Sequence, residues 1–289
     1  MNGQQNTGLE IVGAKRYGPV GECIYCGYRG KTDADLTDEH IIPYALNGNW
    51  ILRKSSCREC ARITGTEVEQ VVLRGELRHV RAAVNFQTRR RVERPQQVKL
   101  LVDGHNVEFP IADCPIILPF IKFPPPGLVD GRPSKRGINA VGSVTIKWGP
   151  DPNDFVRRHG IKEVSFSTNV APAMFARMIA KIGYSFAVAR FGKKSILREV
   201  AAPVILGQSD RIGDIVGCAV ENLPPLPHGP NEHVLQPALY KGGASGGDQL
   251  LAIRVKLFAD SPSPVYEVIV GRPAEPLTDE AMSADHPHD

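Results

Sequence analysis

The sequence predicts an α+β protein in which a short cysteine-rich module precedes a mixed domain of helices and strands. Three features carry this prediction: two Cys-x-x-C pairs within the first 60 residues, helical periodicity in two segments, and alternating strands near the end of the chain. A chain of 289 residues can bury a substantial core. The predicted parts are a flexible leader at 1–20, the module at 21–95, an α+β domain of open role at 96–272 and a disordered tail at 273–289.

The two cysteine pairs predict a metal site. Cys23-x-x-Cys26 and Cys57-x-x-Cys60 flank a turn-rich segment that has few large apolar side chains. Each pair forms a tight turn that directs two thiolates at one point, and two such turns supply the tetrahedral sulfur shell that Zn²⁺ prefers. Four reduced core thiols are the alternative, but the equal spacing and the core-poor segment favour zinc. A closed four-sulfur shell leaves no open position, so the zinc is expected to be structural.

Helical periodicity appears first at residues 66–86. Apolar residues recur there at spacings of 4, 3 and 4, which places them on one face of a helix: Leu73, Leu77, Val80 and Val84. Gly75 inside this segment weakens the prediction, because glycine costs about 1 kcal/mol relative to alanine in a helix.

A second helix is predicted at 172–192, ending at Gly192. Arg177 and Lys181 share one face of this helix and are expected to be solvated. Its apolar face comprises Phe175, Met178, Ile179, Ile182 and Phe186.

Strands are predicted in three places. A hairpin is expected over 98–111 with its turn at Asp103-Gly104, a strand at 143–148, and two late strands at 249–259 and 264–271 that pair.

The excess positive charge lies in the first third of the chain. Residues 1–95 carry 15 Lys and Arg against 11 Asp and Glu, whereas residues 96–289 carry 20 of each. Arginines recur at helical spacing within this part and continue beyond the helix, and several guanidinium groups together bind phosphates. A solvated face neutralised in part by Glu76 and Glu93 is the alternative. The expected partner is DNA, with RNA not excluded, and the expected contacts are Arg74, Arg78, Arg81, Arg89, Arg90 and Arg91.

The sequence lacks an apolar run of the ~18 residues that a membrane span needs, so no membrane partner is expected. Its first residues lack the basic start and apolar stretch of a secretory signal, and the expected location is the cytoplasm.

Between the cysteine pairs lies Glu39-His40-Ile41-Ile42-Pro43, followed by Leu46-Asn47-Gly48. Together with Ser56-Cys57-Arg58-Glu59-Cys60, this pattern resembles the HNH endonucleases, in the branch with a four-cysteine zinc. The resemblance covers about residues 20–95 and implies a ββα-metal fold of treble-clef type. It also implies phosphodiester hydrolysis, with His40 as the general base and Glu39 helping to hold Mg²⁺ or Mn²⁺. Elementary chemistry agrees, because neutral histidine is available near pH 7 and carboxylate oxygens suit a hard cation.

The sequence departs from the family pattern after the second cysteine pair. Ala61 stands where such modules commonly carry Asn or His as a further metal ligand. Glu69, or less favourably Glu67, could supply the missing oxygen, and complementing the helix dipole is an equal alternative for either. Asn47 and Asn49 are candidates for the middle ligand of the motif, or simply turn residues. An incomplete site would leave a non-catalytic zinc-dependent module that binds nucleic acid, or a zinc-stapled scaffold.

Overall fold

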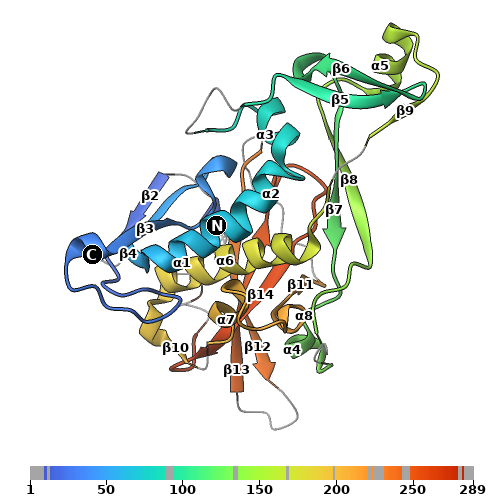
Figure 1. Cartoon of the computed structure of the whole chain (residues 1–289). Coiled ribbons are helices and arrows are strands. Elements are labelled where there is room, and N and C mark those ends of the chain that lie inside the picture. Colours follow the sequence, from blue (N-terminus) through green and yellow to red (C-terminus); the bar gives the residue numbers. More distant parts are fainter. Residues whose placement is uncertain are drawn as a thin grey trace, which may run out of the picture.

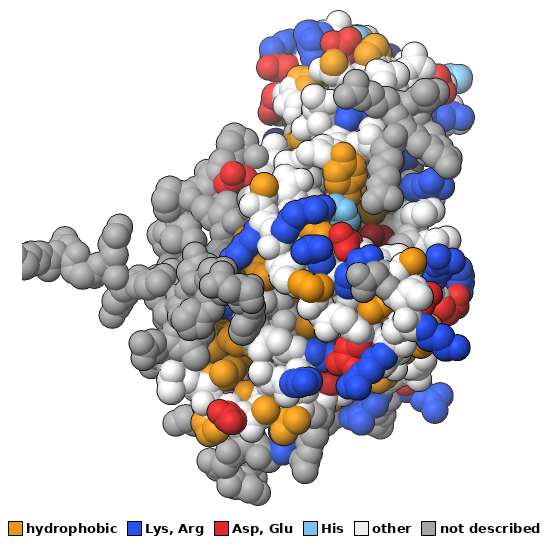
Figure 2. Space-filling model, turned by 90° about the vertical axis from the view of Figure 1, so that its left-hand side faces the viewer, with side chains coloured by type: hydrophobic (Ala, Val, Ile, Leu, Met, Phe, Trp, Pro, Cys, Tyr) orange, Lys and Arg blue, Asp and Glu red, His pale blue; other side chains and the backbone are white. Residues whose placement is uncertain are grey.

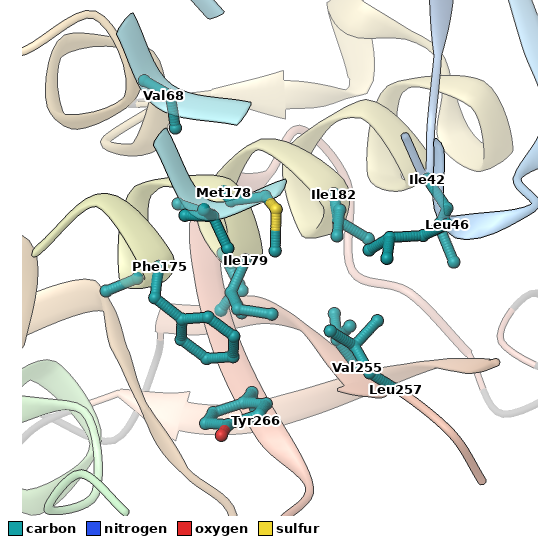
Figure 3. Close-up of a cluster of buried hydrophobic side chains, with 14 of the residues drawn as sticks. Ile42, Leu46, Val68, Phe175, Met178, Ile179, Ile182, Val255, Leu257 and Tyr266 are labelled. Atoms are coloured by element: carbon teal, nitrogen blue, oxygen red, sulfur yellow. The ribbon is translucent and has the colours of Figure 1, made fainter. Parts of the chain in front are cut away.

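The computed structural model describes residues 10–11, 14–88, 94–132, 136–166, 169–197, 199–220, 223, 231–242, 248–278 and 282. A long central helix, α6 (Pro172–Phe191), lies between the N-terminal module and a C-terminal sheet (Figure 1). Buried side chains from all three parts form one hydrophobic core. Figure 3 shows part of this core, in which side chains of the module (Ile42, Leu46 and Val68), of α6 (Phe175, Met178, Ile179 and Ile182) and of the C-terminal region (Val255, Leu257 and Tyr266) lie together.

The N-terminal module is a small three-stranded sheet followed by helix. Strands β3 (Leu36–His40) and β4 (Asn49–Cys57) form an antiparallel pair, and β2 (Ala14–Tyr17) lies parallel to β4 on its other edge. β2 falls in the segment expected to be a flexible leader, so that expectation fails at residues 14–17, because these residues complete the sheet. Two short 3-10 turns, η1 (Asp33–Asp35) and η2 (Tyr44–Leu46), lie within the module.

The helix predicted at 66–86 begins earlier than expected and is broken. The chain turns helical directly after Cys57, because the Cys57 side chain caps the helix by accepting from the Cys60 backbone N–H. The break falls at Gly75, where an added Cβ would lie 2.6 Å from the Val71 carbonyl oxygen. One continuous helix is therefore the wrong description. The segments are α1 (Arg58–Arg62), a π-helical stretch η3 (Ile63–Glu69), α2 (Gln70–Arg74) and α3 (Arg78–Ala83).

The middle of the chain forms an arm that projects from the body (Figure 1). The predicted hairpin is confirmed as β5 (Gln97–Val102) and β6 (His105–Pro110), joined by Asp103 and Gly104 at positive φ. The predicted strand at 143–148 is confirmed as β8 (Gly142–Trp148), which pairs with β7 (Ile116–Lys122). The other elements of this part of the chain are η5 (Ile111–Asp113), α4 (Gly127–Asp130), α5 (Pro152–His159) and β9 (Val164–Ser165). Of these, α4 lies against the body, at the opposite end of the β7–β8 pair from the β5–β6 hairpin (Figure 1).

The C-terminal sheet is antiparallel, in the order β1-β12-β13-β14-β10, with β11 also paired to β14. The predicted pairing of the two late strands is confirmed by β13 (Asp248–Lys256) and β14 (Tyr266–Pro273). The other strands and short helices are β1 (Glu10–Ile11), η6 (Lys193–Ser195), β10 (Ile196–Leu197), α7 (Ala201–Ile205), α8 (Ile212–Ile215), β11 (Val216–Cys218) and β12 (Val234–Gly242).

Helix α6 is confirmed, but its burial differs from the expectation of one apolar stripe. Every residue from 178 to 190 is buried, because the module covers one side and the sheet the other. Lys181 is 0% exposed. Arg177 is half-buried and donates from Nε and Nη2 to the Ile205 carbonyl oxygen at 3.1 and 2.7 Å. The expectation that Arg177 and Lys181 are solvated is therefore wrong.

Of the helices in the described ranges, none combines the length and the apolar character that crossing a bilayer requires.

Candidate active site

The four module cysteines lie together in the structure. Their Sγ atoms are all within 4.8 Å of one another, and Cys26 Sγ lies 3.7 Å from Cys57 Sγ. A tetrahedral zinc with bonds of about 2.3 Å separates its sulfurs by about 3.8 Å. The donor set and spacing therefore fit a zinc ion held by Cys23, Cys26, Cys57 and Cys60. Burial raises the pKa of the Cys23 and Cys60 thiols, and a bound zinc would overcome this by stabilising the thiolates.

Side chains from the second half of the chain hold the first cysteine turn in place. Lys193 Nζ donates to the Cys23 carbonyl oxygen at 2.8 Å, and the Tyr184 hydroxyl donates to the Ile24 carbonyl oxygen at 2.8 Å. Within the turn, the Gly27 N–H donates to the Cys23 carbonyl oxygen, and Gly27 has a φ of 75°. The sulfur cluster thus lies between the β-hairpin and the end of α6.

His40 is the last residue of β3, directly opposite Ile51 of β4. Its ring is half-buried, packs edge-on against Tyr44 and places Nδ1 3.4 Å from the Gly48 carbonyl oxygen. A proton shared between Nδ1 and that carbonyl leaves the lone pair on Nε2, which is the form a general base needs.

The loop that positions the Gly48 carbonyl is tightly packed. A Cβ on Gly48 would lie 2.1 Å from the Ile42 carbonyl oxygen, so only glycine allows this approach of the two segments. Asn47 is exposed at φ 62°, and its N–H donates to the Tyr44 carbonyl oxygen. Asn47 therefore serves the turn, while Asn49 opens β4.

Glu39 and Glu69 come together around a cation that the sequence did not reveal. Lys181 Nζ lies 2.7 Å from Glu39 Oε1 and 2.9 Å from Glu69 Oε1. The same ammonium donates to the main-chain carbonyl oxygen of His40 and, at 3.3 Å, to that of Ile41. Burial alone would lower the pKa of Lys181, but the two carboxylates outweigh it and hold that pKa above its usual range.

This arrangement occupies both predicted carboxylate ligands of the divalent cation that the family resemblance implies. The two carboxylates that could bind Mg²⁺ or Mn²⁺ already share a buried ammonium, and Ala61 offers no donor atom in its side chain. Glu67, the less favoured alternative, pairs instead with Arg62, whose Nη1 lies 2.8 Å from Glu67 Oε1. As arranged, these residues do not fit a divalent ion.

Lys181 could have been suspected from the sequence. Most of its helix is apolar around the whole circumference, which is typical of a helix buried on all sides. A lysine inside such a helix needs an anionic partner, but the sequence does not identify carboxylates more than 100 residues away.

The predicted phosphate-binding arginines differ in their surroundings. Arg74 and Arg78 are exposed, on α2 and α3. Arg81 is half-buried and donates from Nε to the Ala45 carbonyl oxygen at 2.7 Å and from Nη1 to the Leu73 carbonyl oxygen at 2.8 Å, so it ties the loop after His40 to the helix. Arg89, Arg90 and Arg91 lie outside the described residues. Figure 2 shows Lys and Arg side chains spread over one face of the molecule, with Asp and Glu among them.

Comparison with known proteins agrees with this geometry. Residues 23–75 match a family model described as HNH endonuclease. Neither the curated proteins nor the solved structures include a significant match to the chain. The matched segment contains both cysteine pairs, His40, Glu39 and Glu69. Residues 23–75 of this chain are therefore similar to the HNH endonuclease family, and the clustered cysteines are consistent with its four-cysteine branch.

Proposed function

We propose that this protein is an endonuclease that hydrolyses phosphodiester bonds in DNA, with His40 as the general base. The observation that carries the proposal is the setting of His40 within the family-matched segment. Its ring lies at the end of a strand, half-buried, with Nδ1 beside the Gly48 carbonyl. Nε2 would take a proton from water, and the resulting hydroxide would attack phosphorus. The bond from phosphorus to the 3′ oxygen would break, and that oxygen would take up a proton from solvent.

The zinc in this proposal is structural. Four thiolates close its coordination shell, so it supplies no water or substrate position and instead fixes the hairpin that carries His40. Glu39 and Glu69 do not act as ligands of a divalent ion in this proposal, because both carboxylates are paired with Lys181.

Nicking of supercoiled plasmid by the zinc-loaded full chain tests this function. Replacement of a general base is expected to slow cleavage by about 10² to 10⁴-fold, so His40→Ala should nick at least about a hundredfold more slowly than wild type. His105→Ala is the matched control, because His105 is an exposed histidine at the start of β6. Equal rates for wild type and His40→Ala would contradict the proposed base.

A second candidate is a zinc-dependent module that binds nucleic acid without cutting it. Ala61 and the pairing of both carboxylates with Lys181 favour it, because together they remove the ligands of the implied metal. Salt-dependent DNA binding without nicking in Mg²⁺, Mn²⁺ or divalent-free buffer would favour this candidate over the nuclease. DNA binding that is insensitive to salt would favour a scaffold role instead.

We further propose that Arg74 and Arg78 contact phosphates. Removing one phosphate-binding arginine should reduce the slope of log affinity against log salt by about 1, so Arg74→Gln and Arg78→Gln should each flatten that slope and weaken binding across all DNA sequences. Arg157→Gln, which removes an exposed arginine paired with Asp154 on the arm, is the control. An unchanged slope in both variants would count against these contacts.

A further inference from the structure

Lys181 lies outside the family-matched segment, yet its ammonium lies inside the site of that segment. It reaches there from the middle of α6 and is 0% exposed, while the side chains of Glu39 and Glu69 are 8% and 17% exposed. A charged side chain buried to this degree is costly unless its partners offset the loss of hydration. Here two carboxylates and two main-chain carbonyls do so.

The shell around Lys181 Nζ consists of oxygens alone, the ligand chemistry that a hard cation attracts. Both carboxylates approach through one oxygen each, from the two elements that would clasp a metal: Glu39 from β3 and Glu69 from the end of η3. The carbonyls of His40 and Ile41 complete the shell at the point where β3 ends. The ammonium therefore contacts the main chain of the proposed general base itself.

We propose that Lys181 is a built-in cation that takes the place of a divalent ion between Glu39 and Glu69, and that it positions His40. A tethered ammonium suits this buried space because Mg²⁺ holds several waters when it binds, and the surroundings of Nζ are protein oxygens in a closed core. The first part of the proposal, that Lys181 replaces a divalent ion (cation replacement), follows from these contacts alone. The second part, that Lys181 positions His40, rests on the proposed nuclease function.

A consequence is that the site depends on both halves of the chain. The matched module supplies the two carboxylates and His40, and α6 supplies the positive charge that keeps them together. The zinc-loaded full chain should therefore need no divalent ion at these carboxylates.

Manganese binding to the zinc-loaded full chain tests the inference without relying on activity. Wild type should show no Mn²⁺ binding that depends on Glu69. Lys181→Ala leaves two facing carboxylates and a space, so it should gain a Mn²⁺ site that is at least about tenfold tighter than any Mn²⁺ binding by wild type, measured by electron paramagnetic resonance. Adding Glu69→Gln to that variant should abolish the gain. Lys147→Ala is the matched control, because Lys147 pairs with a single carboxylate, that of the exposed Asp151.

Cation rescue separates positioning from a merely structural role. The melting temperature of Lys181→Ala should rise on addition of Mn²⁺ or propylammonium, while that of wild type stays constant. If Lys181→Ala does not fold by itself, it should be refolded in the presence of Mn²⁺ or of propylammonium. Recovery of the folded protein with either cation supports the inference, and failure with both overturns it. Mn²⁺ that binds wild type but not Glu69→Gln would also overturn it, as would a folded Lys181→Ala with no increase in Mn²⁺ affinity.

Nicking assays then distinguish this inference from the proposed function. Cleavage by wild type in zinc-loaded, divalent-free buffer supports both. Cleavage that requires Mg²⁺ and is absent in Glu69→Gln leaves the nuclease intact but overturns cation replacement. If no buffer supports cleavage but the Mn²⁺ results are as expected above, the proposed nuclease function and the positioning of His40 are both contradicted. The proposal that Lys181 takes the place of a divalent ion would still hold.

Discussion

At the scale of single residues, Cys57 combines two functions that one substitution can separate. Its sulfur belongs to the cluster, and it also caps α1 by accepting from the Cys60 N–H. Serine is a strong helix cap but a poor zinc ligand compared with thiolate. Cys57→Ser therefore preserves the start of the helix while removing one metal ligand.

Cys57→Ser should lower the zinc content from one ion per chain to almost none and destabilise the module. Structural zinc contributes on the order of 10 kcal/mol of binding free energy in isolated zinc modules, so the melting temperature should fall markedly. Elemental analysis and thermal melting measure both effects. Cys218→Ser, outside the cluster, should retain the zinc. A Cys57→Ser variant with one zinc and the wild-type melting curve would refute the four-thiolate site.

The sequence predicts residues whose chemistry depends on short spacing and misses those whose partners are distant. The cysteine pairs and the Glu39-His40 dipeptide are local patterns. The oxygens around the Lys181 ammonium do not form a local pattern, because they belong to residues about 110 to 140 positions away in the chain. Arg81 also shows this limit: helical spacing predicts a phosphate contact, whereas its guanidinium binds the Ala45 and Leu73 carbonyls.

At the scale of elements, the β3–β4 connection determines where His40 lies. The loop brings the Gly48 carbonyl next to Nδ1, and Gly48 packs against the Ile42 main chain. A methyl group at this position meets backbone, which cannot move aside as a flexible side chain can.

Gly48→Ala should lower the free energy of unfolding by about 2 kcal/mol or more, because overpacking of this kind costs about 1 to 3 kcal/mol even where side chains can adjust. Gly65→Ala is the matched control: nothing lies within 4 Å of its added Cβ, and alanine in this helical stretch should leave stability unchanged or raise it by up to about 1 kcal/mol. Urea unfolding measures both variants. Equal stability of the two would show that the loop relaxes around the methyl group.

Element prediction succeeds where pattern and turn chemistry agree. The Asp103-Gly104 turn and the alternating strands around it predict β5 and β6, and both form. The pairing of β2 with β4 escapes prediction, because a four-residue parallel edge strand has no local turn to define its partner. Periodicity alone predicts one helix across residues 66–86, whereas the structure interrupts it at Gly75.

At the scale of the whole molecule, His233 connects the C-terminal sheet to the loop of the proposed active site. It lies just before β12 and is buried. Its Nε2 lies 2.7 Å from the Leu46 carbonyl oxygen, and its Nδ1 accepts from the Phe258 N–H. These two bonds require the neutral imidazole with the proton on Nε2. The loop beside His40 is thus held by residues near the far end of the chain.

This connection predicts that the contribution of His233 to stability is lost in mild acid. Burial lowers the pKa of His233 to about 4, from the ordinary value of 6.5. Between these values the unfolded chain binds a proton that the folded protein does not, so stability is complete above pH 6.5 and falls as the pH approaches 4. Between pH 7 and pH 5 this amounts to about 2 kcal/mol.

His233→Phe should remove that part of the pH dependence, although its stability at pH 7 should be lower because two main-chain partners lose their bonds. Burial raises the pKa of Glu76 to about 7, which gives an opposite dependence in the same range, but this carboxyl is common to wild type and variant. The difference between their urea unfolding free energies at pH 7 and pH 5 therefore isolates His233. His105→Phe should keep the wild-type dependence. If the stability of His233→Phe changed between pH 7 and pH 5 as that of wild type does, His233 would not be the source of this part of the pH dependence.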